Sequence, residues 1–344
     1  MNNFELSFQR YLFTDLFISN NRIIFISIVY QDDITFDFSL INCFFNNKIY
    51  KFTTPYIKLY HEPCVIGILE HDDITNYLKQ SNVIFCKIQY KDKHKSFLLS
   101  LNPSKPIYNL TIFTLFKDDS YLINSWIEYY LSKGVQHFFL YFNGKLNNIK
   151  HIIINFDPKI VTFVEWDYPY YHWYDKPDSY YYKLYNITYV DKHHAQPMAI
   201  NSCLYRFGPL TKWLAFFDLD EYIVYNDKLP KLLELYNEET TAEIYFSNAF
   251  AMFTHHFDKT HLKLSDIQNN IIMRQYVNFD ILTRIKKIVN VHNVHLTGIH
   301  ENVYKKINTN IIMPTHYFFH FYTLSPKNRL ISDETPYNII DKLL

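Results

Sequence analysis

Glycine is scarce in this chain: the 344 residues include only 5. No two glycines have the spacing of G-x-G-x-x-G or of G-x-x-x-x-G-K-[ST], so the glycine loops that cradle phosphate groups are excluded. A chain of this composition that handled a nucleoside diphosphate would have to neutralise its phosphates in another way. A divalent cation held by carboxylates is the obvious substitute.

Net charge and long apolar runs are also absent. Lysine plus arginine (34) balances aspartate plus glutamate (34), so no overall field attracts nucleic acid, and we expect no nucleic-acid partner. No window approaches eighteen apolar residues, and charges occur throughout the amino terminus, so we expect neither a signal peptide nor a membrane span and predict a cytoplasmic protein. Hydrophobic residues make up 48% of the chain and aromatic residues 19% of it, so the sequence predicts a folded protein.

Cysteine is rare and unpaired in the sequence. The four cysteines contain no C-x-x-C pair, and three of them fall in expected strands. Buried free thiols are therefore favoured over a zinc site or a disulfide framework. They are Cys43, Cys64, Cys86 and Cys203.

The first part of the chain has the pattern of a β-rich unit. Short β-branched and aromatic runs separated by polar clusters extend from about Arg22 to Leu101. Their spacing predicts a small β-sandwich. Two prolines within Asn102 to Pro106 indicate a linker, so we expect a β-rich domain over residues 1–105.

Residues 106–344 alternate between strand and helix patterns. Strands are expected over 107–116, 135–142, 160–164 and 213–217, with helices from about 118 to 133 and from 191 to 207. Gly134 fits the position that follows a helix end. This βαβ series predicts an α/β fold with a mostly parallel, Rossmann-like sheet, in which ligands bind beyond the carboxyl ends of the strands. From about Leu229 onward the pattern is weaker.

The segment Trp213 to Tyr222 (WLAFFDLDEY) contains the residues that point to a metal site. Side chains alternate along an extended strand, so Asp218 and Asp220 project to the same side at the end of an apolar strand. Two carboxylates that share a small volume repel each other unless a cation lies between them, which predicts an Mg²⁺ or Mn²⁺ site. The alternative is an ordinary acidic turn, but the position at a strand end favours the metal site.

Three blocks of sequence resemble glycosyltransferase family 92 and related family 2-like transferases. The block QPMAINSCLYRFGPLTKWLAFFDLDEY (Gln196 to Tyr222) resembles the pattern Q…A…N-x-C-L…R…W-L-x-F-x-D-x-D-E of that family. A second block, Phe113 to Gly144, resembles its amino-terminal signature, which includes a tryptophan in the helix. The third block is KKIVNVHNVHLTGIH (Lys286 to His300), followed by His316-Tyr317. The blocks occur in the expected order over Phe113 to Tyr317.

This resemblance implies a GT-A fold that transfers a sugar from a nucleotide-sugar donor to a glycan or protein acceptor, usually with inversion. Asp218 would face the donor ribose or the metal, Asp220 would be the main metal carboxylate, and Glu221 would support the site as one of its catalytic residues. The Asn-Glu pair of the family is replaced by Asp118-Asp119, and the aspartate of its Tyr-Asp-Asn turn is replaced by Phe142. These replacements fall at strand ends, where the nucleoside would bind. Gln196 and Asn201 belong to the matching block and are further candidates for binding the donor.

Several roles stay open between residues. The general base that activates the acceptor hydroxyl is expected among Asp258, Asp280 and Glu301. Candidates for holding the diphosphate are Arg206, Arg274, Arg284, Lys286 and Lys287, of which the resemblance favours the two lysines; an exposed cationic face is the alternative. The resemblance places histidines near His300 and His316, which are candidate metal ligands, while a hydrogen-bonded core histidine is the competing interpretation.

An aromatic segment follows the third expected strand. Residues 166–189 concentrate two tryptophans and many tyrosines around prolines. Aromatic faces can cover the apolar side of sugar rings, so this segment could form a wall of the acceptor site. Ordinary core packing is the alternative of equal weight.

The leading hypothesis is a glycosyltransferase that depends on Mn²⁺ or Mg²⁺. The first alternative is an inactive glycan-binding or structural module on the same fold, which the unusual residues Asp119 and Phe142 motivate. The second is a metal-dependent phosphohydrolase, which would normally need more acidic ligands on neighbouring strands than the sequence offers.

Overall fold

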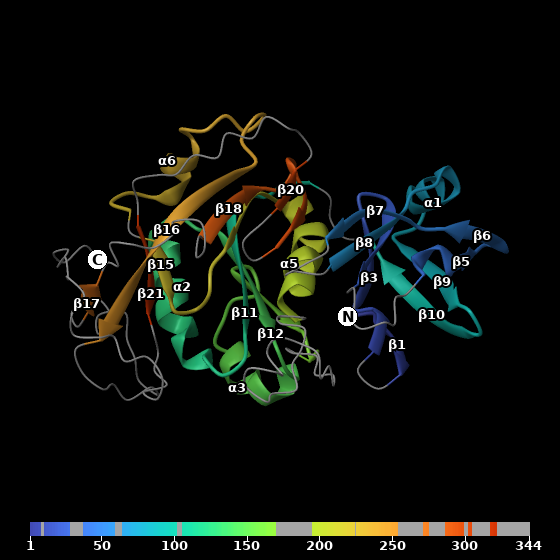
Figure 1. Ribbon diagram of the computed structural model, residues 1–344, viewed down its shortest axis with the longest axis horizontal. Helices are drawn as coiled ribbons and strands as arrows, with labels where there is room; N and C mark the ends of the chain where they lie inside the picture. The colour runs from blue at the N-terminus through green and yellow to red at the C-terminus, as the bar shows by residue number, and fades with distance from the viewer. Residues whose placement is uncertain are drawn as a thin grey trace, which may run out of the picture.

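The computed structural model describes residues 1–7, 10–27, 37–58, 64–101, 105–169, 195–223, 225–253, 271–274, 286–298, 302–304 and 317–321. It is a mixed α/β structure in which strands predominate. Figure 1 shows a smaller, strand-rich body formed by the start of the chain beside a larger body that holds the main sheet and its helices. Among the helices in these residues, none is both long and apolar enough to cross a membrane.

The smaller body contains two four-stranded antiparallel sheets, with orders β3-β4-β8-β7 and β10-β9-β5-β6, and a separate β1-β2 pair. Side chains from the facing sides of the two sheets share one hydrophobic core. The short strands were predicted from Arg22 onward, whereas the strands before it and a short helix were not. The elements are β1 (Phe4–Ser7), β2 (Arg10–Phe13), β3 (Asp15–Ser19), β4 (Arg22–Ser27), η1 (Phe38–Leu40), β5 (Ile41–Phe45), β6 (Lys48–Lys51), β7 (Thr53–Lys58), β8 (Cys64–Leu69), α1 (Asp72–Leu78), β9 (Val83–Tyr90) and β10 (Lys93–Ser100).

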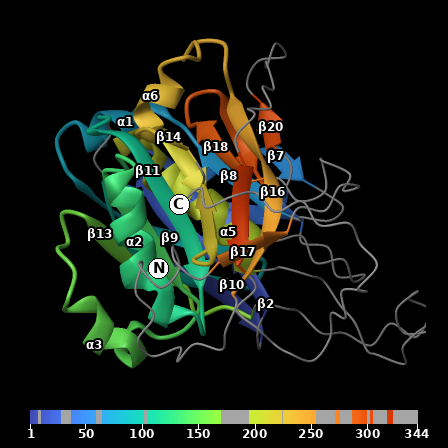
Figure 2. The ribbon, with the colours of Figure 1, turned by 90° about the vertical axis from the view of Figure 1, so that its left-hand side faces the viewer.

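The larger body is built on a nine-stranded sheet of order β13-β12-β11-β14-β18-β16-β21-β15, with β17 paired to β16. Figure 2 shows β11, β14, β18 and β16 side by side in it. Its strands, and the separate β19-β20 pair, are β11 (Tyr108–Phe116), β12 (His137–Phe142), β13 (Val161–Glu165), β14 (Thr211–Phe216), β15 (Glu221–Ile223), β16 (Glu243–Phe253), β17 (Ile271–Arg274), β18 (Lys286–Asn290), β19 (Val294–Thr297), β20 (Asn302–Tyr304) and β21 (Tyr317–Phe321).

The prediction of a mostly parallel sheet is correct for one half of this sheet, whereas the other half is mixed, with β21 parallel to β16 and antiparallel to β15. Strands β13, β12, β11 and β14 pair in parallel, as the continuous apolar runs predict. Next to them, β18 pairs antiparallel with both β14 and β16. The strands of this second half come from the sequence after Leu229, where periodicity is weak and cannot reveal strand direction.

Helices cover both faces of the sheet. α2 (Ile123–Ser132) packs on one face, and α5 (Ala195–Arg206) packs on the other. The core around α5 also includes side chains of β3, β4 and β8, so α5 lies between the large sheet and the smaller body (Figure 1). The remaining short helices are η2 (Ser120–Leu122), η3 (Leu146–Ile149), α3 (Lys150–Ile153), η4 (Gly208–Leu210) and α6 (Leu229–Leu233).

Two local predictions are confirmed. Gly134 follows α2 with a φ of 88°, the left-handed conformation that glycine adopts at least cost after a helix end. All four cysteines are buried and free, in agreement with the prediction of core thiols.

The strand order reverses its direction at β11. β12 lies on one side of β11 and β14 on the other, so the connections that leave these strands diverge. In such sheets ligands bind outside the carboxyl ends of the strands at this point of divergence. Asp118 and Asp218 follow the carboxyl ends of β11 and β14, respectively, so both lie at this edge.

Candidate functional site

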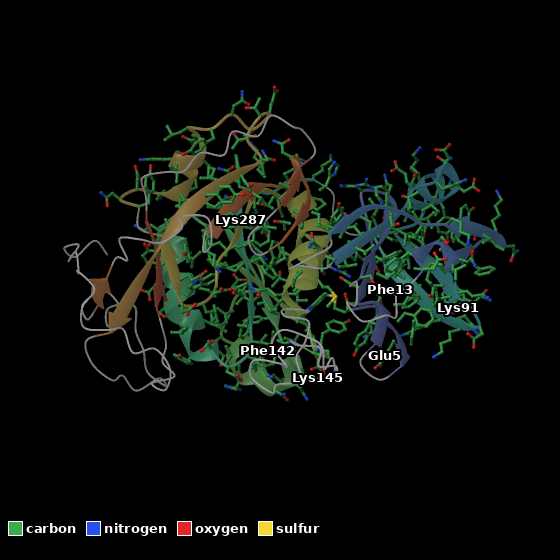
Figure 3. All side chains as sticks on the ribbon, viewed as in Figure 1. Glu5, Phe13, Lys91, Phe142, Lys145 and Lys287 are labelled. Carbon is green, nitrogen blue, oxygen red and sulfur yellow. The ribbon has the colours of Figure 1, made fainter. Side chains whose placement is uncertain are left out.

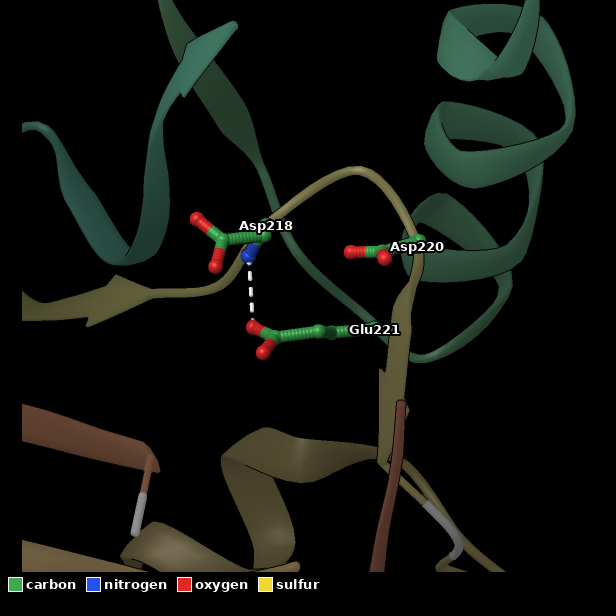
Figure 4. A group of neighbouring side chains, drawn as sticks. All are labelled: Asp218, Asp220 and Glu221. Atoms are coloured by element: carbon green, nitrogen blue, oxygen red, sulfur yellow. Dashed lines mark hydrogen bonds between the residues drawn. The ribbon is translucent and has the colours of Figure 1, made fainter. Parts of the chain in front are cut away.

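A tight acidic turn connects β14 to β15. The backbone N–H of Glu221 donates to the carbonyl oxygen of Asp218 at 3.1 Å, which closes a four-residue turn. The side chain of Glu221 reaches back and accepts from the backbone N–H of Asp218 at 2.6 Å (Figure 4). These two bonds fix the turn, and carboxylate oxygens of Asp218, Asp220 and Glu221 lie within 4.8 Å of one another.

Lys286, the first residue of β18, completes this cluster. Its Nζ lies 2.7 Å from Oδ2 of Asp218 and 2.9 Å from Oε2 of Glu221. Burial lowers the pKa of Lys286, but the two carboxylates outweigh burial and hold the pKa above its usual value. Three carboxylates and one ammonium leave a formal charge of about −2, which suits a divalent cation.

The members of the cluster differ in their access to solvent. The side chain of Glu221 is 0% exposed and that of Lys286 is 13% exposed, whereas the side chain of Asp218 is 37% exposed. A fully buried carboxylate cannot reach an acceptor hydroxyl, so this geometry favours the supporting role of Glu221 over direct catalysis. Carboxylate oxygens are donors that Mg²⁺ and Mn²⁺ prefer, and Asp218 and Asp220 are the accessible ones here, so the residues fit a divalent ion.

Three aromatic residues of α2 support the backbone of this turn. Trp126 Nε1 and the Tyr130 hydroxyl donate to the carbonyl oxygen of Glu221 at 3.2 and 3.0 Å. The Tyr130 hydroxyl also accepts from the N–H of Ile223 at 3.1 Å, and the Tyr129 hydroxyl donates to the carbonyl oxygen of Ile223. Spacings of three and four residues place all three rings on one face of α2. The sequence indicated the tryptophan but not the two tyrosines.

Replacing Tyr130 by Phe tests this support. The variant loses the donor to Glu221 and leaves the buried N–H of Ile223 without this acceptor, so we expect a loss of about 1–3 kcal/mol in unfolding free energy. We also expect weaker Mn²⁺ binding, because the turn loses its anchor. Urea denaturation and Mn²⁺ titration followed by electron paramagnetic resonance measure the two effects. Tyr77→Phe, on an exposed tyrosine of α1, is the matched control and should change neither.

Two residues that were predicted to bind the donor, Arg206 and Asn201, form contacts away from the acidic turn. The guanidinium of Arg206 forms a paired contact with the carboxylate of Asp15, with Nη2 to Oδ1 at 2.6 Å and Nε to Oδ2 at 3.2 Å. The side-chain amide of Asn201 donates to the carbonyl oxygen of Thr297 at 2.7 Å and accepts from its N–H at 3.0 Å. Both residues thus connect α5 to β3 or β19 and do not join the acidic cluster.

The remaining described candidates divide between the site edge and the interior. Asp118 and Asp119 are exposed after β11, at the same sheet edge as the acidic turn. Gln196 lies in the first turn of α5. Lys287 is 1% exposed inside the larger body (Figure 3) and, as the neighbour of Lys286 on a strand, projects to the opposite face of the sheet. Of the two lysines, only Lys286 reaches the cluster.

Several predicted residues lie outside the described residues. They are Asp258, Asp280, Arg284, His300, Glu301 and His316. The aromatic segment is described only at its beginning. There Trp166 is buried and donates to the carbonyl oxygen of Ala195 at 2.9 Å, and Tyr168 is buried and donates to the carbonyl oxygen of Thr14. These two rings belong to the core, as the packing alternative predicts.

Comparison with known families decides the identity of the larger body. A sequence model described as Glycosyltransferase family 92 matches residues 112–341, about two thirds of the chain. The chain belongs to glycosyltransferase family 92. This membership implies glycosyltransferase activity with a sugar donor and an acceptor, and it confirms the resemblance seen in the sequence. A search of curated proteins finds no match.

The family match contains the whole acidic turn and its supports. It begins inside β11 and includes α2, β14, β15 and β18. The strands β1 to β10 precede it, so the smaller body has no counterpart in the matched range.

Proposed function

We propose that this chain is a metal-dependent, inverting glycosyltransferase of the GT-A type, which uses the acidic turn to bind Mn²⁺ or Mg²⁺ and a nucleotide-sugar donor. The observation that carries the proposal is the grouping of Asp218, Asp220 and Glu221 within 4.8 Å at the carboxyl edge of the parallel strands. The scarcity of glycine supports it, because the chain has no phosphate loop that could replace the ion.

The residues divide the work in this proposal. A bound divalent cation supplies charge neutralisation for the departing nucleoside diphosphate. Asp218 and Asp220 would hold the ion with their partly exposed carboxylates, while Glu221 fixes the turn. Lys286 keeps Asp218 oriented by its 2.7 Å contact, rather than binding the diphosphate itself. Asp118 and Asp119 lie where they can contact the nucleoside.

The remaining roles are proposals from the sequence. His300 and His316 are further candidate ligands for the ion, and Asp258 and Glu301 are candidates for the base that removes the proton of the acceptor hydroxyl. The acceptor is a glycan or a protein.

A two-domain division into residues 1–105 and 106–344 belongs to the same proposal, with a β-sandwich preceding the transferase. It is supported by two hydrophobic cores, one formed only by residues between Phe4 and Leu101 and the other only by residues between Leu110 and Ile288. A third core around α5 contains residues from both parts. The first part therefore supports the transferase through α5.

Thermal shift with a panel of uridine and guanosine diphosphate sugars, with and without Mn²⁺, tests the function. We expect one donor class to raise the melting temperature by about 5 °C near a hundredfold excess over its dissociation constant, and only with the ion present. Slow donor hydrolysis should accompany the shift, and nuclear magnetic resonance of the product sugar should report inversion. A shift of equal size without metal would contradict metal dependence, and a lack of both donor binding and hydrolysis would favour the inactive module.

A further inference from the structure

The smaller body has an outermost face that no described element covers. Residues of β9 alternate strictly, with Ile84, Cys86, Ile88 and Tyr90 buried and the residues between them at least partly exposed. The buried side of the sheet β10-β9-β5-β6 packs on β3-β4-β8-β7, and the latter packs on α5. Among the described residues, the other side of the sheet therefore forms the far surface of this end of the molecule (Figure 1).

Large apolar side chains gather on that far surface. Leu98 and Phe85 are directly opposite each other on β10 and β9 and are 67% and 64% exposed. Phe44 is opposite Ile49 on β5 and β6, and Ile49 is 62% exposed. Lys87 is opposite Phe44 and two residues from Phe85, so it connects the two pairs. We call these five residues the outer patch; cross-strand neighbours lie about 5 Å apart, which makes the patch continuous across four strands.

The charges on this face have one sign. The other residues that alternation places on it are Asn42, Lys51, Val83, Gln89, His94, Ser96 and Ser100. None of the described residues of this face is acidic, whereas Lys51 and Lys87 are cationic. The Nζ of Lys87 lies 4.8 Å from the centre of the Phe44 ring, so the positive charge lies directly beside the apolar surface.

This combination selects the kind of partner. A second copy of the chain would bring the lysines of this face against the same lysines, which opposes self-association, because among the described residues the acidic neighbour of Lys51 is Asp37, at the border of the face. An anionic partner would pair its charges with the lysines. An apolar layer behind those charges would contact the apolar side chains of the patch. Four strands about 4.8 Å apart give a face about 15 Å wide, broad enough to rest on a surface.

We propose that the outer patch docks the protein on an anionic lipid bilayer. Phe85, Leu98 and Ile49 enter the boundary between head groups and acyl chains, while Lys51 and Lys87 lie beside lipid phosphates. Lysines near an anionic leaflet and apolar side chains in its interface contribute independently to such binding. The proposal is independent of the transferase function, since none of these residues belongs to the larger body.

Sedimentation of the full chain with vesicles tests the docking. We expect binding to phosphatidylcholine vesicles that contain about 30 mol % phosphatidylserine, and little binding to phosphatidylcholine alone. The variant Phe85→Ser with Leu98→Ser should weaken binding at least about tenfold, because two apolar side chains no longer enter the interface. Lys51→Glu with Lys87→Glu should weaken binding and reduce its salt dependence.

The matched control replaces exposed apolar residues of the larger body. Ile154 and Leu235 are 71% and 73% exposed, and Ile154→Ser with Leu235→Ser should leave vesicle binding unchanged. Melting temperatures of the Phe85/Leu98 and Ile154/Leu235 variants should match the wild type, because these four side chains are exposed. Absence of binding to anionic vesicles, or equal binding by the Phe85/Leu98 variant, overturns the proposal. A dimer in light scattering that this variant abolishes, without vesicle binding, would instead assign the patch to a second copy.

Discussion

Asp220→Asn is expected to reduce sugar transfer by at least about a hundredfold. The substitution keeps the size of the side chain but removes one carboxylate from the two that are accessible in the acidic turn. Metal-assisted stabilisation of a departing diphosphate is worth several kcal/mol, and each 1.4 kcal/mol corresponds to about a factor of ten in rate. The loss should appear in kcat/KM and in Mn²⁺ affinity together.

Asp227→Asn is the matched control for this experiment. Asp227 is an exposed aspartate that pairs with Lys231 at 2.6 Å, only a few residues beyond the acidic turn. The control should keep both the activity and the Mn²⁺ affinity of the wild type. Unchanged turnover in Asp220→Asn would remove the acidic turn from the mechanism, whereas a lower melting temperature in that variant alone would mark Asp220 as structural.

Arg206→Met is expected to destabilise the protein by about 3–5 kcal/mol. The Asp15 carboxylate is 0% exposed and depends on the guanidinium of Arg206 and on the Ser202 hydroxyl, which donates at 2.7 Å. Burial lowers the pKa of Arg206, but Asp15 outweighs burial and raises it. Removing the cation leaves a buried charge without its main partner, which is the costly way to break such a pair.

A double-mutant cycle separates this contact from general damage. Asp15→Leu combined with Arg206→Met removes both charges, so its loss of unfolding free energy should be clearly smaller than the sum of the single losses. Glu238→Gln breaks the exposed pair with Lys212 and should cost less than about 1 kcal/mol in the same urea denaturation. If Arg206→Met instead keeps full stability and lowers donor affinity, Arg206 binds the diphosphate, as the sequence suggested.

Much of the larger body could be predicted from its sequence because the relevant signals are local. The continuous apolar runs of β11, β12 and β14 mark strands that are covered on both faces, and Gly134 marks the end of α2. The second half of the sheet, in which strands pair in both directions, was not predicted. The local sequences of β18 and β16 do not predict which strand each one pairs with, or whether the pairing is parallel or antiparallel.

In the candidate site too, local sequence predicted some residues, whereas contacts between distant segments were not predictable. Asp218 and Asp220 could be assigned from one short segment, because alternation along a strand and the strand end place them together. Lys286 was expected to hold a diphosphate, yet it comes from 68 residues later in the chain and bonds to the carboxylates themselves. Arg206 was assigned to the same task and instead pairs with Asp15, which lies 191 residues earlier.

The sequence by itself determined the family, the α/β class and the pair of acidic side chains that follows β14, because residue type and short-range spacing encode them. Only the tertiary structure decided which charges meet: Lys286 with the acidic turn, and Arg206 with Asp15. The physical reason is that a buried charge is stable only beside an opposite one. The oppositely charged partner lies on a strand that is distant in sequence and becomes a neighbour only in the folded structure. A local sequence pattern therefore cannot predict it.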